Sequence, residues 1–496
     1  MRAAKIGLLF LILMFGASVE TLWQVRENVG LGPLGCQVLG GRLYGASFVF
    51  ESSEERPVAA GRAVAVENAF GDVTVRAGEP GKVAVSLRKV VFRPKAEEAR
   101  VFAERLRVVV REESGRLVVT TNREDLDRER PGGRQVGFET HLELTVPADT
   151  PLTVRNEHGG IDASGVAAAD LTGSFEDVKA AEIAGALKLD VQHGGAEVRA
   201  VGGALTLTGK HGDVAAEDVK GAVSVQREHG DVTLSRVGPT VVSTTHGAIR
   251  IDGVGGDLEA RAVHGGVEAE RIAGRAVVSS TNDGITVRHV DGEARLRAEH
   301  GGIEAEDVLG AVFAEASFAD VRLLRIGKDV DVTVEHGGVD GRALAGAVRV
   351  KSSGDDVSLD GFASALDVES DRGSVDLSPA GPITHQISVR ARHGGITLRV
   401  PSGSDLTLEA DARPGDLEVD LPDFVAERTE DASTAGRVGK GGVSVKLSAN
   451  NGDVRVQHAA RADGDAEEAR DADPPAPPAA PNAPAAPPAP HASPES

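Results

Sequence analysis

The chain has 496 residues and a formal net charge of −22 at pH 7. An acidic surface disfavours nucleic acid as a partner, because phosphates require a basic one. Aromatic residues make up 3% of the chain, too few for the stacking platforms that bind sugars or exposed bases. The single cysteine, Cys36, excludes an intrachain disulfide and a cysteine metal cluster.

The first segment, residues 1–23, has the residue order of an export signal. Arg2 and Lys5 precede an apolar run from Ile6 to Val19, as in the charged and apolar regions of a signal peptide. The run is shorter than the ~20 residues of a spanning helix, so a cleaved signal peptide and a retained signal anchor both remain open. Either one places the rest of the chain outside the cytoplasm and limits membrane contact to this segment. Residues 24–59 are expected to be a linker.

Residues 60–150 are expected to form a small β-rich cap that contains one helix. Pro94 opens a helical stretch, Lys95 to Arg107, with Ala99, Phe102 and Leu106 on one face. Five strand-like stretches surround it: Arg62 to Val66, Val73 to Arg76, Val83 to Phe92, Leu117 to Thr121 and His141 to Val146. Such a module would cover the first coil of a repeat structure.

A His-Gly turn returns at a fixed interval in the next segment, and an apolar residue, here called the anchor, follows each copy. Histidine is optional, since five copies have another spelling of the turn: Phe175-Glu176-Asp177, Asn282-Asp283-Gly284, Phe318-Ala319-Asp320, Gly354-Asp355-Asp356 and Arg372-Gly373-Ser374. Successive anchors are 17 or 18 residues apart until the last step of 21. The anchors are Ile161, Val178, Ala196, Val214, Val232, Ile249, Val267, Ile285, Ile303, Val321, Val339, Val357, Val375 and Ile396. Such a short unit cannot enclose a core alone, whereas units stacked at the strand spacing can.

Small or apolar residues alternate with polar ones on both sides of each anchor, as in half-buried strands. One copy has Val223, Val225, Val232, Leu234 and Val237 in these positions. The sequence therefore predicts an all-β chain, a single β-solenoid (β-helix) of about 18-residue coils over 151–400 with terminal coils over 401–458.

Glycine recurs at the corner opposite the His-Gly turn. The copies are Gly185, Gly203, Gly221, Gly274, Gly292, Gly310 and Gly346. Both corners of each coil are therefore expected to accept left-handed backbone. The final segment, residues 459–496, is acidic and then rich in alanine and proline, and it is expected to be a disordered, extended tail.

The order of these elements resembles a known family. The phrase from Val66 to Val75, the helix, and the stretch from Leu142 to Thr150 precede serial Gly-Asp-Val-type turns. This order resembles the bacterial putative-adhesin family, also called toastrack domains, over about residues 60–458. The resemblance implies a right-handed extracytoplasmic β-solenoid with an adhesive or envelope-stress-sensing role, and no catalytic residues. A period of 18 is also three hexapeptides, as in left-handed solenoids, so both hands remain open.

Histidine replaces the Ser, Thr or Asn that the family more often has in this turn. Five consecutive coils carry one, so the rings should stack about 4.8 Å apart: His193, His211, His229, His246 and His264. One interpretation is a structural ladder, since His tolerates turn conformations. The other is a metal- or pH-responsive row. Two nitrogens at about 2.0–2.1 Å from one zinc would have to leave the stack, which favours the structural interpretation.

These observations predict a non-catalytic interaction scaffold of the bacterial cell envelope, with no cofactor and an unidentified envelope or surface protein as partner. A metal- or pH-responsive binding module is the alternative, and a solenoid polysaccharide lyase or hydrolase is the third. Acidic residues precede several histidines, namely Glu157, Glu228, Glu299 and Glu335. Neighbouring strand residues point to opposite faces, so solvation is expected for them. The sequence leaves the oligomeric state open.

Overall fold

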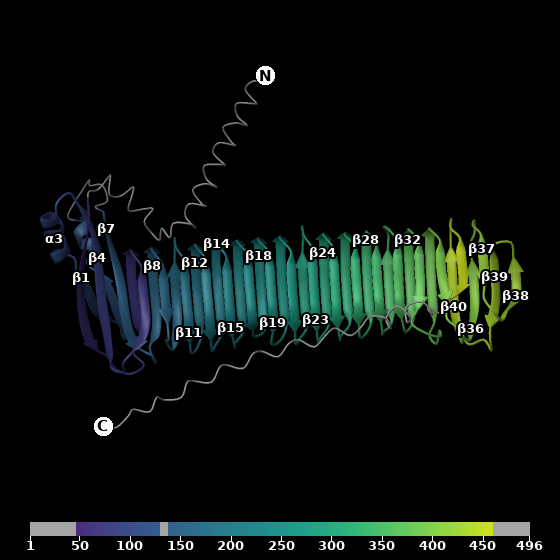
Figure 1. Ribbon diagram of the computed structural model, residues 1–496, viewed down its shortest axis with the longest axis horizontal. Helices are drawn as coiled ribbons and strands as arrows, with labels where there is room; N and C mark the ends of the chain where they lie inside the picture. Colours follow the sequence, from purple (N-terminus) through teal and green to yellow (C-terminus); the bar gives the residue numbers. More distant parts are fainter. Residues whose placement is uncertain (1–45, 129–136, 460–496) are drawn as a thin grey trace, which may run out of the picture.

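The computed structural model describes residues 46–128 and 137–459, which form an elongated rod with a mixed α/β cap at its N-terminal end (Figure 1). The predicted all-β solenoid is confirmed, with about 14 coils at the predicted spacing of about 18 residues. The predicted signal at 1–23, part of the predicted linker and nearly all of the predicted tail lie outside the described residues. In the part of the chain that is described, no helix combines the length and apolar character needed to cross a membrane. The hand of the coil stays a prediction.

Each coil contributes one strand to each of two parallel sheets. The first, here called the even sheet, contains β8 (Pro151–His158), β10 (Ala168–Gly173), β12 (Leu187–His193), β14 (Leu205–His211), β16 (Val223–His229), β18 (Thr240–His246), β20 (Leu258–His264), β22 (Ala276–Ser280), β24 (Ala294–His300), β26 (Val312–Phe318), β28 (Val330–His336), β30 (Val348–Ser352), β32 (Leu366–Arg372) and β34 (Ile387–His393).

The second, here called the odd sheet, begins with the anchor residues. It contains β9 (Ile161–Ser164), β11 (Val178–Ile183), β13 (Ala196–Val201), β15 (Val214–Val219), β17 (Val232–Val237), β19 (Ile249–Val254), β21 (Val267–Ile272), β23 (Ile285–Val290), β25 (Ile303–Val308), β27 (Val321–Ile326), β29 (Val339–Leu344), β31 (Val357–Phe362), β33 (Val375–Pro379) and β35 (Ile396–Val400).

The core lies between the two sheets and is built from the alternating residues that the period predicted. Val223, Val225, Val232, Leu234 and Val237 are all buried, and equivalent residues of neighbouring coils lie beside them in parallel register. Full burial of a valine or leucine side chain stabilises a fold by roughly 1.5–3 kcal/mol. The thin interior therefore gains its stability by repetition along the rod.

The N-terminal cap contains more strands than predicted. Its strands are β1 (Ala46–Pro57), β2 (Val64–Phe70), β3 (Val73–Gly78), β4 (Lys82–Arg93), β5 (Val108–Glu113), β6 (Arg116–Thr121) and β7 (Phe138–Pro147), with α3 (Ala96–Arg105) and α4 (Arg123–Arg128) as helices. The predicted helix is confirmed as α3, whose Ala99 and Phe102 are buried together with the neighbouring Leu106.

The linker prediction for residues 24–59 is wrong in its second half, because residues 46–57 form strand β1. This strand pairs antiparallel with β4 along its whole length. Most of its side chains are exposed, so its sequence lacks the alternation that would identify a strand. Phe48 and Phe50 fix it in place by packing against the α3 cluster.

The coil order is permuted at both ends of the rod. At the N-terminal end, β2 and β3 lie between β8 and β9 on one side and β6 and β7 on the other. The C-terminal elements are β36 (Leu406–Asp411), β37 (Leu417–Asp420), β38 (Phe424–Glu430), β39 (Ser433–Val438), β40 (Val443–Ala449) and β41 (Val454–His458).

The last coil in sequence, β40 and β41, inserts between the coil of β34 and β35 and the coil of β36 and β37. The antiparallel pair of β38 and β39 then covers β36 (Figure 1). Antiparallel strands cover the even sheet at both ends and the odd sheet at the N-terminal end, where they pair with backbone groups that the parallel coils would leave open and so protect against edge-to-edge aggregation.

The prediction of left-handed backbone at the far-corner glycines is wrong. None of these glycines has a φ in the left-handed region. They are required by close stacking, since a Cβ on Gly221 would lie 2.5 Å from the carbonyl carbon of Gly203 one coil earlier. In the coils anchored from Ile161 to Val357, the left-handed residue on this side is instead the fourth after the anchor, for example Asp218 at φ 57° and Ala343 at φ 55°.

Candidate functional site

A continuous row of side chains runs along the corner between the even and odd sheets, three residues before each anchor. We call this row the ring ladder. Its members are Phe70, His158, Phe175, His193, His211, His229, His246, His264, Asn282, His300, Phe318, His336, Gly354, Arg372, His393 and Asn451. Glycine follows most histidines because the turn requires positive φ: Gly247 has φ 144°, and a Cβ there would lie 2.0 Å from the carbonyl oxygen of Gly230.

The five predicted histidines stack in the predicted order. From His193 to His264 the ring centroids are 5.1, 4.7, 4.6 and 4.7 Å apart, and the interplanar angles are 19°, 7°, 14° and 18°. The backbone pairs each histidine directly with the next. The coil spacing therefore fixes the ring spacing.

The stack is longer than predicted, because phenylalanines continue it. Phe70 of the cap stacks on His158 at 4.4 Å, and Phe175 lies 4.6 Å from His158 and 5.3 Å from His193. The sequence carried this signal, since Phe175 has the same offset from its anchor as the histidines. The apolar rings indicate that stacking, and not imidazole chemistry alone, is the common requirement of the position.

Asparagine occupies two positions of the ring ladder, and its side chain there contacts the neighbouring histidine. The Asn282 Nδ2 lies 2.9 Å from the Nδ1 of His264, so a hydrogen bond replaces the ring contact. Beyond it, Phe318 stacks between His300 at 5.2 Å and His336 at 4.7 Å. Asn451 contacts His393 in the same way, at 3.3 Å.

The electrostatic environment of the ladder favours neutral imidazole at His211. Desolvation lowers the pKa of His211, and the neighbouring His229 and His193 lower it further, while Glu228 opposes them. Within residues 46–128 and 137–459, no group of three or more His, Cys, Asp or Glu side chains is placed to hold a metal ion. The metal interpretation of the five histidines stays a prediction.

Two acidic positions lie close to the ladder, and only one of them bonds to the backbone. The Asp of each Gly-Asp-Val turn accepts from the next coil: Asp213 Oδ1 accepts from the Asp231 amide, and Asp231 Oδ1 from the Ala248 amide, both at 2.9 Å. The acids that precede histidines, Glu157, Glu228, Glu299 and Glu335, are all exposed. Neither set converges on a shared point.

Sequence reasoning missed a buried arginine beneath the ladder. Arg227 is 3% exposed and points into the rod. It donates to four backbone carbonyls of two earlier coils: from Nε to Gly212 at 2.8 Å and from the guanidinium nitrogens to Val191 at 2.9 Å, Gly194 at 2.6 Å and His211 at 3.0 Å. Desolvation lowers its pKa. The sequence did contain an indication of this burial. Arg227 occupies a position of the repeat whose side chain points into the rod, and the equivalent residue one coil earlier is Gly209.

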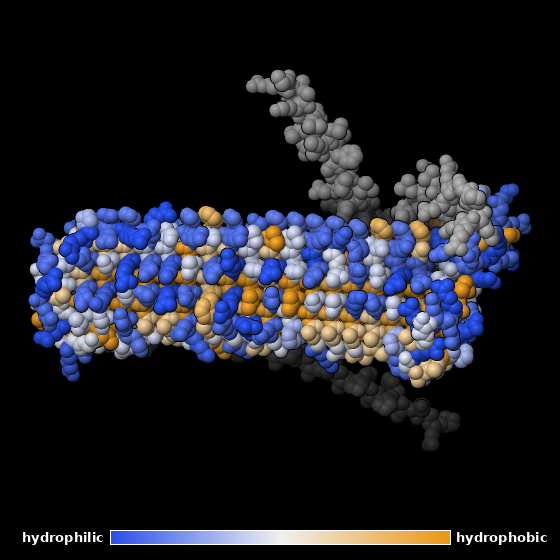
Figure 2. Space-filling model, turned by 180° about the vertical axis from the view of Figure 1, so that it is seen from behind, coloured by the Kyte–Doolittle hydropathy of each residue, from blue (hydrophilic) through white to orange (hydrophobic). Residues whose placement is uncertain are grey.

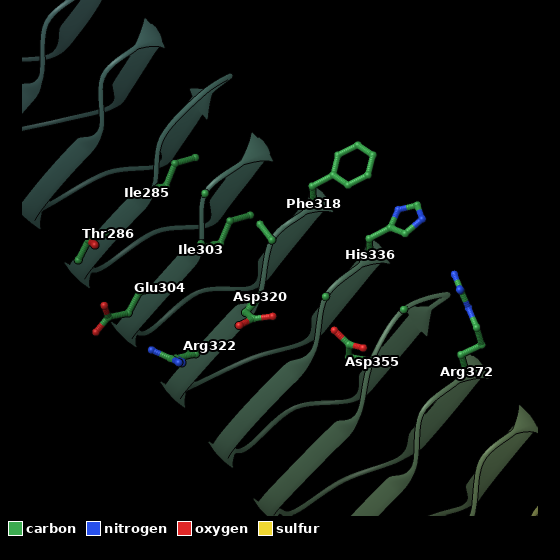
Figure 3. A pocket seen from close by; sticks show the side chains of 15 residues that line it. Ile285, Thr286, Ile303, Glu304, Phe318, Asp320, Arg322, His336, Asp355 and Arg372 are labelled. Atoms are coloured by element: carbon green, nitrogen blue, oxygen red, sulfur yellow. The ribbon is translucent and has the colours of Figure 1, made fainter.

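An open groove of about 730 Å³ runs beside the ladder from Ile285 to Arg372 (Figure 3). Phe318, His336 and Arg372 lie along one edge, and Asp320, Asp355 and Arg322 lie on the turns and on the odd sheet. Between the coils of His336 and Arg372 the ladder position is Gly354, which has no side chain. The groove therefore coincides with an interruption of the ladder.

Comparison with known proteins agrees with this architecture. Residues 241–457 match the Toastrack DUF4097 family, so the toastrack resemblance predicted from the sequence is confirmed over the second half of the rod. A crystal structure of a "putative cell adhesion protein" from Clostridium sporogenes aligns with 83% of this chain and 100% of its own, at 8% identity and a TM-score of 0.14. A similarity at that level supports no inference about function. Among curated proteins, none matches the chain.

Proposed function

We propose that this chain, which carries a toastrack-type β-solenoid domain, is a non-catalytic interaction scaffold outside the cytoplasm in the bacterial cell envelope. The observation that carries the proposal is the uniformity of the rod. Equivalent positions of successive coils form rows along its whole length, and Figure 2 shows hydrophilic rows alternating with apolar ones on the visible face. A surface of this kind suits extended contact with a partner.

The charged rows are held by ion pairs between neighbouring coils. Arg236 Nε lies 2.6 Å from Asp218 and Arg325 Nε lies 2.5 Å from Asp307, one coil apart in each case. These side chains are between about a third and somewhat more than half exposed, and ion pairs between such exposed groups contribute little to the stability of a fold. Their repetition therefore shapes the surface more than it stabilises the fold.

Two perturbed arginines on the surface of the rod are also compatible with a non-catalytic role. The raised pKa values of Arg236 and Arg325 arise from hydrogen bonds to surface carboxylates. Catalytic sites instead combine desolvation with a charged partner inside a cleft. The protein should release no unsaturated ends from acidic polysaccharides; release that survives purification to homogeneity would contradict the non-catalytic role.

Location can be tested on the full chain in its own host. Cells are fractionated, and intact cells and spheroplasts are treated with protease. The proposal expects the rod in the envelope or exported fraction, cleaved only when protease reaches that compartment. Recovery with the cytoplasmic marker, protected from protease until cells are lysed, would overturn the envelope proposal.

A second candidate is a metal- or pH-responsive binding module, which the unbroken stack of five imidazoles favours. Titration with zinc or nickel, monitored by calorimetry, compares the wild type with His246→Asn. A responsive module should bind the metal saturably, with several-fold weaker binding in the variant. If the wild type and His246→Asn gave equal heats that did not saturate, the metal-responsive module would be excluded and the scaffold proposal would stand.

A further inference from the structure

The ring ladder omits a single side chain within the described residues from Phe70 to Asn451. Rings, amides and a guanidinium occupy its other positions, and Gly354 alone has nothing beyond Cα. The omission is enforced by packing, because a Cβ on Gly354 would lie 2.4 Å from the Gly337 amide nitrogen. The space over Gly354, between His336 and Arg372, is here called the Gly354 notch.

One wall of the notch is the imidazole of His336. Its other face stacks on Phe318 at 4.7 Å with an interplanar angle of 9°. Because Phe318 in turn stacks on His300 at 5.2 Å, the wall is the end of a fixed three-ring stack. The ring of His336 is held on one side, while the side toward Gly354 faces the groove.

The opposite wall is the guanidinium of Arg372, held in the same file as the rings. Its Nε donates to the carbonyl oxygen of Ser353 at 3.0 Å. In the histidine coils, Nδ1 of His193 lies 3.3 Å from the carbonyl oxygen of Ser174, which is the equivalent residue one coil earlier. Arg372 therefore makes the ladder's own backbone contact, with a planar cation in place of a ring.

The spacing of the two walls suits one ring. His336 and Arg372 are two coils apart, or roughly 9.6 Å at the usual strand spacing. A planar group between them would lie about 4.8 Å from each wall, as the ladder rings do from one another. Figure 3 shows the two side chains on coils that flank one with no ladder side chain, at the open groove.

We propose that the Gly354 notch binds one planar, electron-rich aromatic ring, an indole or a phenol, between the His336 imidazole and the Arg372 guanidinium. A guanidinium over such a ring is attracted by its electron-rich face, and indole gives the strongest interaction of this type. Asp320, Asp355 and Glu304 line the groove and outnumber its arginines, so a neutral ring binds better than an anionic one. The inference does not depend on where the protein resides.

The ring has two possible sources, an exposed tryptophan or tyrosine of a protein and a free aromatic compound. The full chain is titrated with N-acetyltryptophanamide and with a Gly-Gly-Trp-Gly-Gly peptide, observed by saturation-transfer NMR and by histidine ring signals. Saturable binding with a shift at His336 and none at His193 is expected. Tighter binding of the peptide would indicate a protein source, and equal binding a free compound.

Variants separate the notch from general surface binding. Arg372→Gln should weaken ring binding by roughly threefold to tenfold, the range of one cation–π contact, while Arg392→Gln, an exposed arginine one coil on, should leave it unchanged. His246→Ala should open a gap between His229 and His264 that has two imidazole walls and no guanidinium, and this gap should bind the ring more weakly than the Gly354 notch does. Circular dichroism confirms that each variant is folded. The proposal would be overturned if the wild type showed no saturable binding of the aromatic ring, or if Arg372→Gln left that binding unaltered.

Discussion

Arg227 and Gly209 are paired one coil apart inside the rod, and the guanidinium of Arg227 occupies space that a side chain on Gly209 would fill. A Cβ on Gly209 would lie 1.9 Å from a guanidinium nitrogen of Arg227. The missing side chain of Gly209 therefore provides the space through which Arg227 reaches four carbonyl oxygens. Other coils have apolar or small residues at this inward position, for example Val334.

This pairing predicts strong coupling between the two positions. Arg227→Val should destabilise the rod by about 3 kcal/mol, because buried carbonyls lose their donor. Gly209→Val should also destabilise it, through overpacking against the guanidinium and against the carbonyl oxygen of Val191, which would lie 2.0 Å from the new Cβ. The double variant restores two stacked valines and should be less destabilised than the sum by 0.5–3 kcal/mol, the range of coupled neighbours. Urea unfolding measures all four proteins, with exposed Arg261→Val as a control near zero; strict additivity would contradict the pairing.

The histidine ladder predicts that acid destabilises the rod. The folded-state pKa of His211 is lowered by desolvation and by His229 and His193, so the unfolded chain binds the proton more readily. Stability is then fully present above the unfolded pKa and declines as pH falls through it, near pH 6.5. The thermal midpoint should drop between about pH 7 and 5, and drop less in His211→Asn. A midpoint that stays flat over this interval in the wild type would contradict the prediction.

His141 in the cap predicts the opposite dependence. Desolvation lowers its pKa, but hydrogen bonds from the imidazole to the carboxylates of Asp72 and Glu139, at 3.1 and 3.2 Å, outweigh it, and the net pKa is raised. This contribution is fully present below the unfolded pKa of about 6.5 and is lost as pH rises through the folded pKa. Amide exchange in β3 and β7 should therefore accelerate above neutral pH beyond its intrinsic rate, and His141→Gln should abolish the extra acceleration. Cap exchange that follows only its intrinsic pH dependence would exclude this role.

The left-handed backbone at Ala343 predicts that glycine in this position stabilises the fold. Ala343 is exposed and has φ 55°, a conformation that costs roughly 1–2 kcal/mol for a residue with a Cβ. After the entropy cost of glycine, Ala343→Gly should raise the free energy of unfolding by about 0.5–1 kcal/mol. The control Ala215→Gly, exposed in strand β15, should lower it by about the same amount. Destabilisation by both substitutions would show that the corner is not strained.

The sequence predicted well the features that every coil repeats. The anchors, the inward alternation and the stack from His193 to His264 depend on equal spacing, and parallel register follows once the coils are stacked. Phe70 and Phe175 were missed as ladder members because the predicted stack was limited to the histidines, although Phe175 was assigned to the same turn of the repeat. The position three residues before the anchor requires a side chain that can stack on its neighbours, and any flat side chain meets this requirement.

Features confined to one coil were not predictable from the period. Arg227 is compatible with the core only because of Gly209, and the insertion of β40 and β41 between earlier coils depends on interactions distant in sequence. Strand β1 has few buried side chains, so its sequence pattern resembles that of a linker. The far-corner glycines were assigned to the correct positions for the wrong reason, since close approach of backbones and positive φ select the same residue type.

The most direct test of the stacked-coil architecture is a set of distances along the rod. Spin labels are placed on Cys36→Ser protein at Glu157 and, in turn, at Glu228, Glu299 or Glu335, which lie four, eight and ten coils further along. Double electron–electron resonance should give backbone separations of about 19, 38 and 48 Å, in proportion to the number of coils. Separations that do not increase in this proportion would contradict the account.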